Sequence, residues 1–143
     1  MKKPISTRDL YRMILEDTEG FGKMIIADDA AFTKETVSSR LDSLMKKHDK
    51  KPSELIRKSL LSKSYVYQII GGVRKPSREA LIRLGIVCEC DVFELLELLM
   101  LSGEGTLYPR IRRDAAILFC VIRKMNLYET DEFLTSIGEN GIF

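Results

Sequence analysis

The side chains whose types and spacing could support binding chemistry are concentrated in one short stretch, residues 62–78. If the apolar residues Val66 and Ile69 face inward, four polar side chains face outward from the same helical stretch: Lys63, Ser64, Tyr67 and Gln68. Their amine, hydroxyl and amide groups can donate hydrogen bonds to base edges, and some can also accept them. The pattern predicts that these four residues read bases in the major groove of DNA.

Groups suited to phosphate surround that stretch. Ser62 begins it, and a helix N-terminus offers unpaired backbone N–H groups to an anion. Arg74, Lys75 and Arg78 follow it, and Lys51 precedes it. Long cationic side chains on both sides of a short helix are suited to contact phosphates beside the groove. We therefore predict phosphate contacts from these five residues.

The distribution of charge agrees with a polyanionic partner. The chain of 143 residues has a formal net charge of only +2. Residues 46–84 nevertheless contain 11 basic and 3 acidic groups, whereas residues 1–45 have a net charge of −1 and residues 85–143 a net charge of −5. A basic middle segment between acidic flanks favours binding to nucleic acid. The alternative is a basic face that is only solvated.

Two short helices joined by a tight turn are predicted to position these residues. Pro52 suits the first turn of a helix that ends near Ser59. Ser62 suits the N-cap of a second helix that continues to about Ile70, where Gly71-Gly72 ends it. Two helices, a glycine stop and a basic loop are typical of a helix-turn-helix.

The motifs in this segment are more specific than its helical pattern. S-x-S-Y-x-x-Q-I begins at Ser62 and G-x-R-x-P-S begins at Gly72. With them, residues 40–96 resemble the Xre/Cro repressor-type family of bacterial and phage regulators, although Pro52, Ile56 and Leu60 stand where that family has Gln, Ala and Gly. The resemblance implies a five-helix repressor-like helix-turn-helix domain, a double-stranded DNA partner and a role as a transcriptional repressor.

Helices are predicted in most of the remaining chain. A helix runs from Ser6 or Thr7 to about Glu16, and the next begins at Asp28-Asp29 or at Thr33. Residues 22–27 form either a short strand or an extended arm. Four further helices are expected from Ser77 onward. The first begins at Ser77 with Glu79 and carries Leu81, Ile82, Leu84 and Ile86. The others are residues 91–101 behind an Asp91–Glu94 capping box, residues 110–125, for which Asn126 is the stop, and residues 129–137.

The fold class expected from these elements is all-α. Residues 1–32 form an N-terminal helix and arm, residues 33–102 form the helix-turn-helix DNA-binding domain, and residues 103–143 form a C-terminal helical extension packed on it. The extension has surplus apolar residues. They either complete the core or form a surface for a homodimer or a partner protein, and the N-terminal helices are a second candidate for dimer formation.

No metal or cofactor is expected. The three cysteines, Cys88, Cys90 and Cys120, and the single histidine lack the usual spacing of four zinc ligands. Burial is expected for Cys88 and Cys120, and solvation for His48 beside Lys46 and Lys47. Motifs of phosphate-binding loops, zinc proteases and serine hydrolases are absent from the sequence, so we predict that the protein is not an enzyme.

A cytoplasmic location without a membrane partner is also predicted. The longest apolar run, residues 115–122, is much shorter than the roughly 20 residues that a membrane-spanning helix needs. Arg8 and Asp9 interrupt any signal-peptide core. The alternative to a DNA-binding regulator is a helical accessory or adaptor subunit whose terminal helices bind a partner protein, with nucleic-acid contact secondary.

Overall fold

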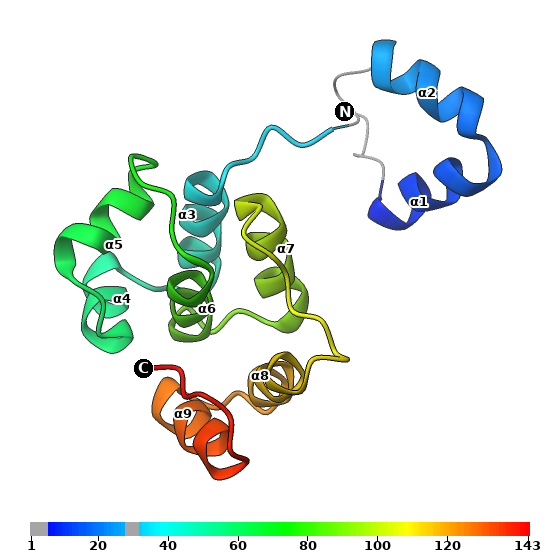
Figure 1. Ribbon diagram of the computed structural model, residues 1–143. Coiled ribbons are helices and arrows are strands. Elements are labelled where there is room, and N and C mark those ends of the chain that lie inside the picture. The colour runs from blue at the N-terminus through cyan, green and yellow to red at the C-terminus, as the bar shows by residue number, and fades with distance from the viewer. Residues whose placement is uncertain (1–5, 28–31) are drawn as a thin grey trace. The chain divides into compact units, whose positions relative to one another are not determined.

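A computed structural model describes residues 6–27 and 32–143, and within these residues it contains nine α-helices and no strand (Figure 1). The all-α prediction is therefore confirmed. The chain divides into two compact units, residues 1–34 and residues 35–143. None of the described helices is long and apolar enough to cross a membrane.

The first unit contains α1 (Thr7–Glu16) and α2 (Thr18–Ala27), which contact each other. Ser6 caps α1 as predicted, because its hydroxyl accepts a hydrogen bond from the backbone N–H of Asp9 at 3.1 Å. Both alternatives for residues 22–27 were wrong, since this segment is the second half of α2. Asp17 starts that helix by accepting the N–H of Gly20 at 3.1 Å. Asp28 and Asp29 lie outside the described residues.

The second unit contains the other seven helices, and Thr36 rather than Thr33 caps the first of them. They are α3 (Val37–Lys47), α4 (Pro52–Ser59), α5 (Lys63–Ile70), α6 (Arg78–Val87), α7 (Val92–Ser102), α8 (Arg112–Ile122) and α9 (Leu127–Ser136). The central helix is α6, which contacts α4, α7 and α9 (Figure 1). Its Leu81, Ile82 and Leu84 are fully buried, and each such side chain contributes about 1.5–3 kcal/mol of burial free energy.

Helix caps explain where the last three helices begin and end. The predicted Asp91–Glu94 capping box is present at the start of α7. Asn126 was expected to end a helix but begins one, because it forms a second capping box with Glu129. The preceding helix ends earlier, at Ile122, and the chain then turns through Lys124 at φ 56°.

The burial predictions for the cysteines and for the histidine have different outcomes. Cys88 and Cys120 are buried as expected, and Cys90 is buried as well. The prediction that His48 is solvated was wrong. The imidazole is half-buried, with Nε2 2.9 Å from Oε1 of Glu94, because α7 packs beside the C-terminal end of α3.

Candidate nucleic-acid interface

The turn between α4 and α5 determines how α5 is presented. Leu60 ends α4 in the left-handed conformation, with φ 61°, at the position where the resembled motif has Gly. Ser62 then caps α5 by accepting the N–H of Tyr65 at 3.2 Å. Leu55 of α4 and Val66 of α5 are fully buried and hold the two helices on the core. The first turn of α5 is left at the surface.

The outward face of α5 follows the predicted pattern. Val66 and Ile69 are buried. Lys63 and Ser64 are exposed, and Tyr67 keeps 48% of its surface accessible. The fourth predicted base-reading residue, Gln68, is half-buried. Its backbone carbonyl accepts hydrogen bonds from the backbone N–H groups of Val73 at 2.9 Å and Arg74 at 3.1 Å.

The loop of residues 71–77 is fixed against α5 by one aromatic side chain. The hydroxyl of Tyr65 accepts a hydrogen bond from the N–H of Ser77 at 3.0 Å. The guanidinium of Arg74 lies over the ring of the same tyrosine, 4.8 Å from its centroid. The sequence reasoning missed Tyr65, although it is the aromatic residue of the S-x-S-Y motif. Its two contacts hold Arg74 next to the N-terminal half of α5.

Two of the other predicted phosphate contacts are exposed lysines. Lys51 is the N-cap residue of α4. The ammonium group of Lys75 lies 3.1 Å from Glu104, in an ion pair in which both side chains are largely solvated. Such a pair contributes little to stability and is readily exchanged for another anion. Both lysines thus remain accessible to a phosphate.

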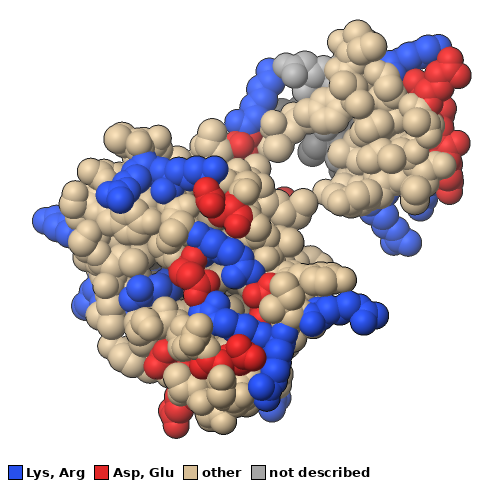
Figure 2. Space-filling model, viewed as in Figure 1, with Lys and Arg blue, Asp and Glu red and all other residues tan. Residues whose placement is uncertain are grey.

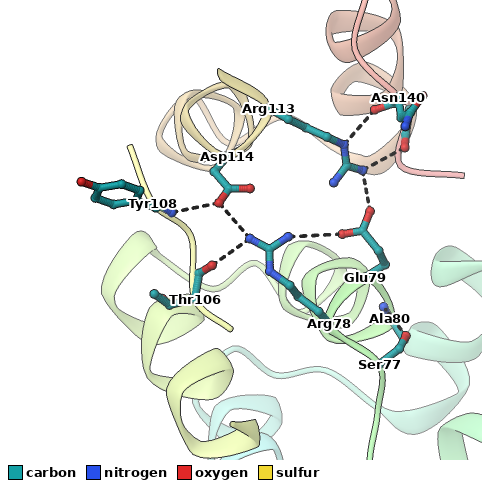
Figure 3. Close-up of polar contacts among 10 residues, drawn as sticks. Ser77, Arg78, Glu79, Ala80, Thr106, Tyr108, Arg113, Asp114 and Asn140 are labelled. Carbon is teal, nitrogen blue, oxygen red and sulfur yellow. Dashed lines mark hydrogen bonds and ion pairs between the residues drawn. The ribbon is translucent and has the colours of Figure 1, made fainter. Parts of the chain in front are cut away.

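Arg78 lies in a different environment (Figure 3). Its Nη2 donates to a carboxylate oxygen of Asp114 at 2.9 Å and to the carbonyl of Thr106 at 2.7 Å. Asp114 also accepts the N–H of Tyr108 at 3.0 Å, and Nη1 of Arg78 lies 3.7 Å from Glu79. The sequence placed Arg78 with the phosphate contacts, and the fold supplies its guanidinium with acceptors inside the chain.

Ion pairs neutralise many of the other basic side chains. The paired lysines of the basic segment are Lys46 with Asp42, Lys47 with Glu94, Lys50 with Glu89, and Lys58 with Glu54. Hydrogen bonding to Glu89 raises the pKa of Lys50, so that pair stays ionised. Among the described residues, no carboxylate lies within ion-pair distance of Lys51, Arg57, Lys63 or Arg74. These four cations come from α4, α5 and their flanks. Arg83 of α6 is likewise without a carboxylate partner among the described residues, and its guanidinium lies over the ring of Phe143, 5.0 Å from the centroid.

On the face seen in Figure 2, basic and acidic side chains are distributed unevenly. Basic side chains lie over the region of α4, α5 and the loop that follows, whereas both signs are mixed over α8 and α9 (Figure 2). We call the group Lys63, Ser64, Tyr67, Gln68 and Arg74 the α5 surface. It combines cations with neutral hydrogen-bonding groups, which is the chemistry needed to bind phosphate and base edges together.

Comparison with known proteins found no family model, no curated protein and no solved structure that matches this chain.

Proposed function

We propose that this protein is a sequence-specific, double-stranded-DNA-binding transcriptional regulator that acts as a repressor, with α5 entering the major groove. The observation that carries the proposal is the α5 surface. Lys63 and Ser64 are exposed at the Ser62-capped start of the helix, and contacts with Tyr65 and Gln68 hold Arg74 against the same helix. This combination provides a helix N-terminus, a fixed cation and polar side chains for bases.

The arrangement of α3 to α7 supports a repressor-like helix-turn-helix domain in residues 33–102. In it, α4 and α5 are joined by three residues and contact each other, and α3, α6 and α7 form the core beneath them. An α-helix with its side chains is about 10–12 Å across, which matches a major groove about 12 Å wide. The exposed outward face of α5 therefore suits insertion into that groove.

The proposal divides the residues by role. Lys63, Ser64, Tyr67 and Gln68 contact bases, and the phosphate contacts are Ser62, Lys51, Arg74 and Lys75. We assign Arg78 to holding the end of the loop against α8, because Asp114 and Thr106 engage its guanidinium. Lys51 and Arg57 add attraction that acts before contact.

Selection of bound duplexes from a random pool, followed by fluorescence anisotropy at several salt concentrations, tests this function. We expect tight binding to the selected duplex, weaker binding to an unrelated one, and a loss of affinity as salt rises. Lys63→Ala and Gln68→Ala should reduce the ratio of the two affinities, since each removes a base contact. If the wild-type chain binds no duplex at low salt, the proposal is refuted.

The α8–α9 region supports self-association of the regulator. Ile122 and Tyr128 keep 66% and 63% of their surfaces accessible, and Phe119 is also exposed. A homodimer that buries these side chains would present two α5 helices, as regulators that bind two half-sites about 34 Å apart require. Sedimentation equilibrium measures this directly, and Ile122→Glu should shift a dimer to a monomer.

The same apolar side chains support the second candidate, an accessory subunit that docks a partner protein. The two candidates differ in what α5 does. In the accessory subunit, Ile122→Glu would abolish partner capture, and Lys63→Ala would have no effect on function. In the regulator, Lys63→Ala changes duplex preference even in a monomeric variant.

A further inference from the structure

A second group of reactive side chains lies where the C-terminal end of α3 meets the start of α7. His48 is the C-cap residue of α3, Cys90 lies in the turn between α6 and α7, and Glu94 is in the first turn of α7. One potential ligand atom from each residue lies within 4.8 Å of the others. A nitrogen, a sulfur and an oxygen donor from three parts of the chain therefore converge.

Backbone contacts hold these donors in place. The turn passes through Glu89 at φ 62°, and the N–H of Cys90 donates to the carbonyl of Gly85 at 3.0 Å. Oε1 of Glu94 accepts the N–H of Asp91 at 2.9 Å and lies 2.9 Å from Nε2 of His48. Cys90 and Glu94 are buried and His48 is half-buried, so the group lies at the edge of the core.

A cavity of about 1150 Å³ reaches this group. His48 and Cys90 line it, together with apolar residues such as Val92 and Val121, four basic residues (Lys47, Arg57, Lys58 and Lys124) and the acidic residues Glu89 and Asp91. The cavity provides a path for an ion and room for water beside the two donors.

We propose that His48, Cys90 and Glu94 bind a divalent thiophilic metal ion, for which Zn²⁺ is the best match, with water from the cavity completing the coordination. Thiolate, imidazole and carboxylate are the three ligand types that zinc takes in proteins. Ligand atoms around a tetrahedral zinc lie roughly 3.5 Å apart. In this structure the three ligand atoms lie up to 4.8 Å apart. Side-chain rotations that move the atoms by about 1 Å would bring them to the distances that zinc requires.

Metal binding in this site exchanges a proton for the ion. Near neutral pH a cysteine thiol without metal is mostly protonated. The sulfur forms its bond to the metal as the S–H bond breaks and the proton leaves to solvent. His48 takes the tautomer with its proton on Nδ1, which exchanges through solvent and frees the lone pair of Nε2 for the metal, and Oε2 of Glu94 keeps its bond from Lys47. Affinity therefore rises with pH.

Titration of the full chain with Co²⁺, followed by absorption spectroscopy, tests the site. We expect one Co²⁺ per chain, with a thiolate-to-cobalt charge-transfer band that Zn²⁺ abolishes by competition. Cys90→Ser should remove the band and weaken metal binding by roughly 100-fold. Cys120→Ser, which removes another buried thiol, should leave the titration unchanged.

A second variant keeps the test decisive if Cys90→Ser does not fold by circular dichroism. His48→Gln can keep a hydrogen bond to Glu94 while removing the imidazole, and we expect roughly 100-fold weaker binding with the charge-transfer band shifted or lost. Absence of a charge-transfer band in the wild type would overturn the proposal. So would a band that survives Cys90→Ser and disappears in Cys88→Ser. The assay contains no DNA, so its result is independent of the proposed regulator function.

Discussion

Two regions of the molecule each contain an arginine from the basic segment 46–84. One is the α5 surface, and the other is the junction of α6 with α8, where Arg78 contacts Asp114 and Thr106. The fold gives these two arginines different surroundings. Arg74 lies over the ring of Tyr65 and is exposed. Arg78, four residues later, contacts Asp114, Thr106 and Glu79, and only 26% of its side chain is accessible (Figure 3). One arginine is available to an external anion, whereas the other stabilises the fold.

A cation that is buried in an ion pair is less available to an external anion than an exposed one, so the position of each charge in the fold matters as much as the net charge of the segment. Arg113 of α8, which lies outside the basic segment, is also engaged within the chain, because its guanidinium donates to Glu79 and to the carbonyls of Asn140 and Gly141 (Figure 3). The acidic C-terminal flank supplies partners for the basic segment as well. Its Asp114 supplies the carboxylate that neutralises one of the basic residues.

The largest effect should come from breaking the junction with Asp114→Asn. The change removes the carboxylate from a half-buried guanidinium and weakens the acceptor of the Tyr108 N–H. We expect the free energy of unfolding, measured by urea denaturation, to fall by about 3 kcal/mol. Glu104→Gln, which affects only the exposed pair with Lys75, should cost less than about 0.5 kcal/mol. Equal losses would show that the two environments do not differ in stability.

Glu94 forms a second internal cluster of charged groups with Lys47 and His48, at the contact of α3 with α7. We expect the stabilisation from this cluster to be lost in acid. Burial alone would raise the pKa of Glu94, but hydrogen bonds from Lys47, the Asp91 backbone and His48 outweigh it and hold the pKa at about 2. Because this pKa is lower in the folded state, the stabilisation is present above about pH 4.5 and is lost as pH falls toward 2.

We expect this loss to be about 2 kcal/mol, measured by urea denaturation at several pH values with a metal chelator present. Glu94→Gln should flatten the dependence across the same interval. An unchanged slope in that variant would assign the acid sensitivity to other carboxylates.

Arg74→Ala should separate the two arginines in DNA binding. We expect about tenfold weaker binding to every duplex and a salt slope smaller by about 0.9, because one phosphate contact is lost. Arg123→Ala is the matched control, since Arg123 also lies over an aromatic ring, that of Phe119, but on the α8 side. In Arg78→Ala, stability should fall while the salt slope stays the same. A reduced slope in Arg78→Ala would return that residue to the phosphate contacts.

The smallest effect is expected from Tyr65→Phe. The variant keeps the ring beneath Arg74 and removes the hydroxyl that accepts the Ser77 N–H. The free energy of unfolding should fall by about 1 kcal/mol, with a smaller loss of DNA affinity than in Arg74→Ala. Tyr128→Phe, whose hydroxyl has no hydrogen bond within the described chain, provides the baseline. If Tyr65→Phe lowers the free energy of unfolding no more than Tyr128→Phe does, the Tyr65 hydroxyl does not hold the loop.

Local signals predicted the helices of the second unit well. Pro52, Ser62 and the Asp91–Glu94 capping box act within one helical turn, so the boundaries of α4, α5 and the start of α7 follow from neighbours in the sequence. Errors arose where a local signal has two meanings. Asn126 can end a helix or begin one, and the glycines of residues 20–22 did not break α2.

The amino-acid sequence by itself determined the all-α fold class, the burial of Val66 and Ile69, and the position of the basic segment, because periodicity, capping and charge depend on nearby residues. Only the tertiary structure decided which cations stay free and which reactive groups meet. Asp114 lies 36 residues after Arg78, and Cys90 lies 42 residues after His48. No local pattern specifies such pairs, since helix packing over the shared core brings them together.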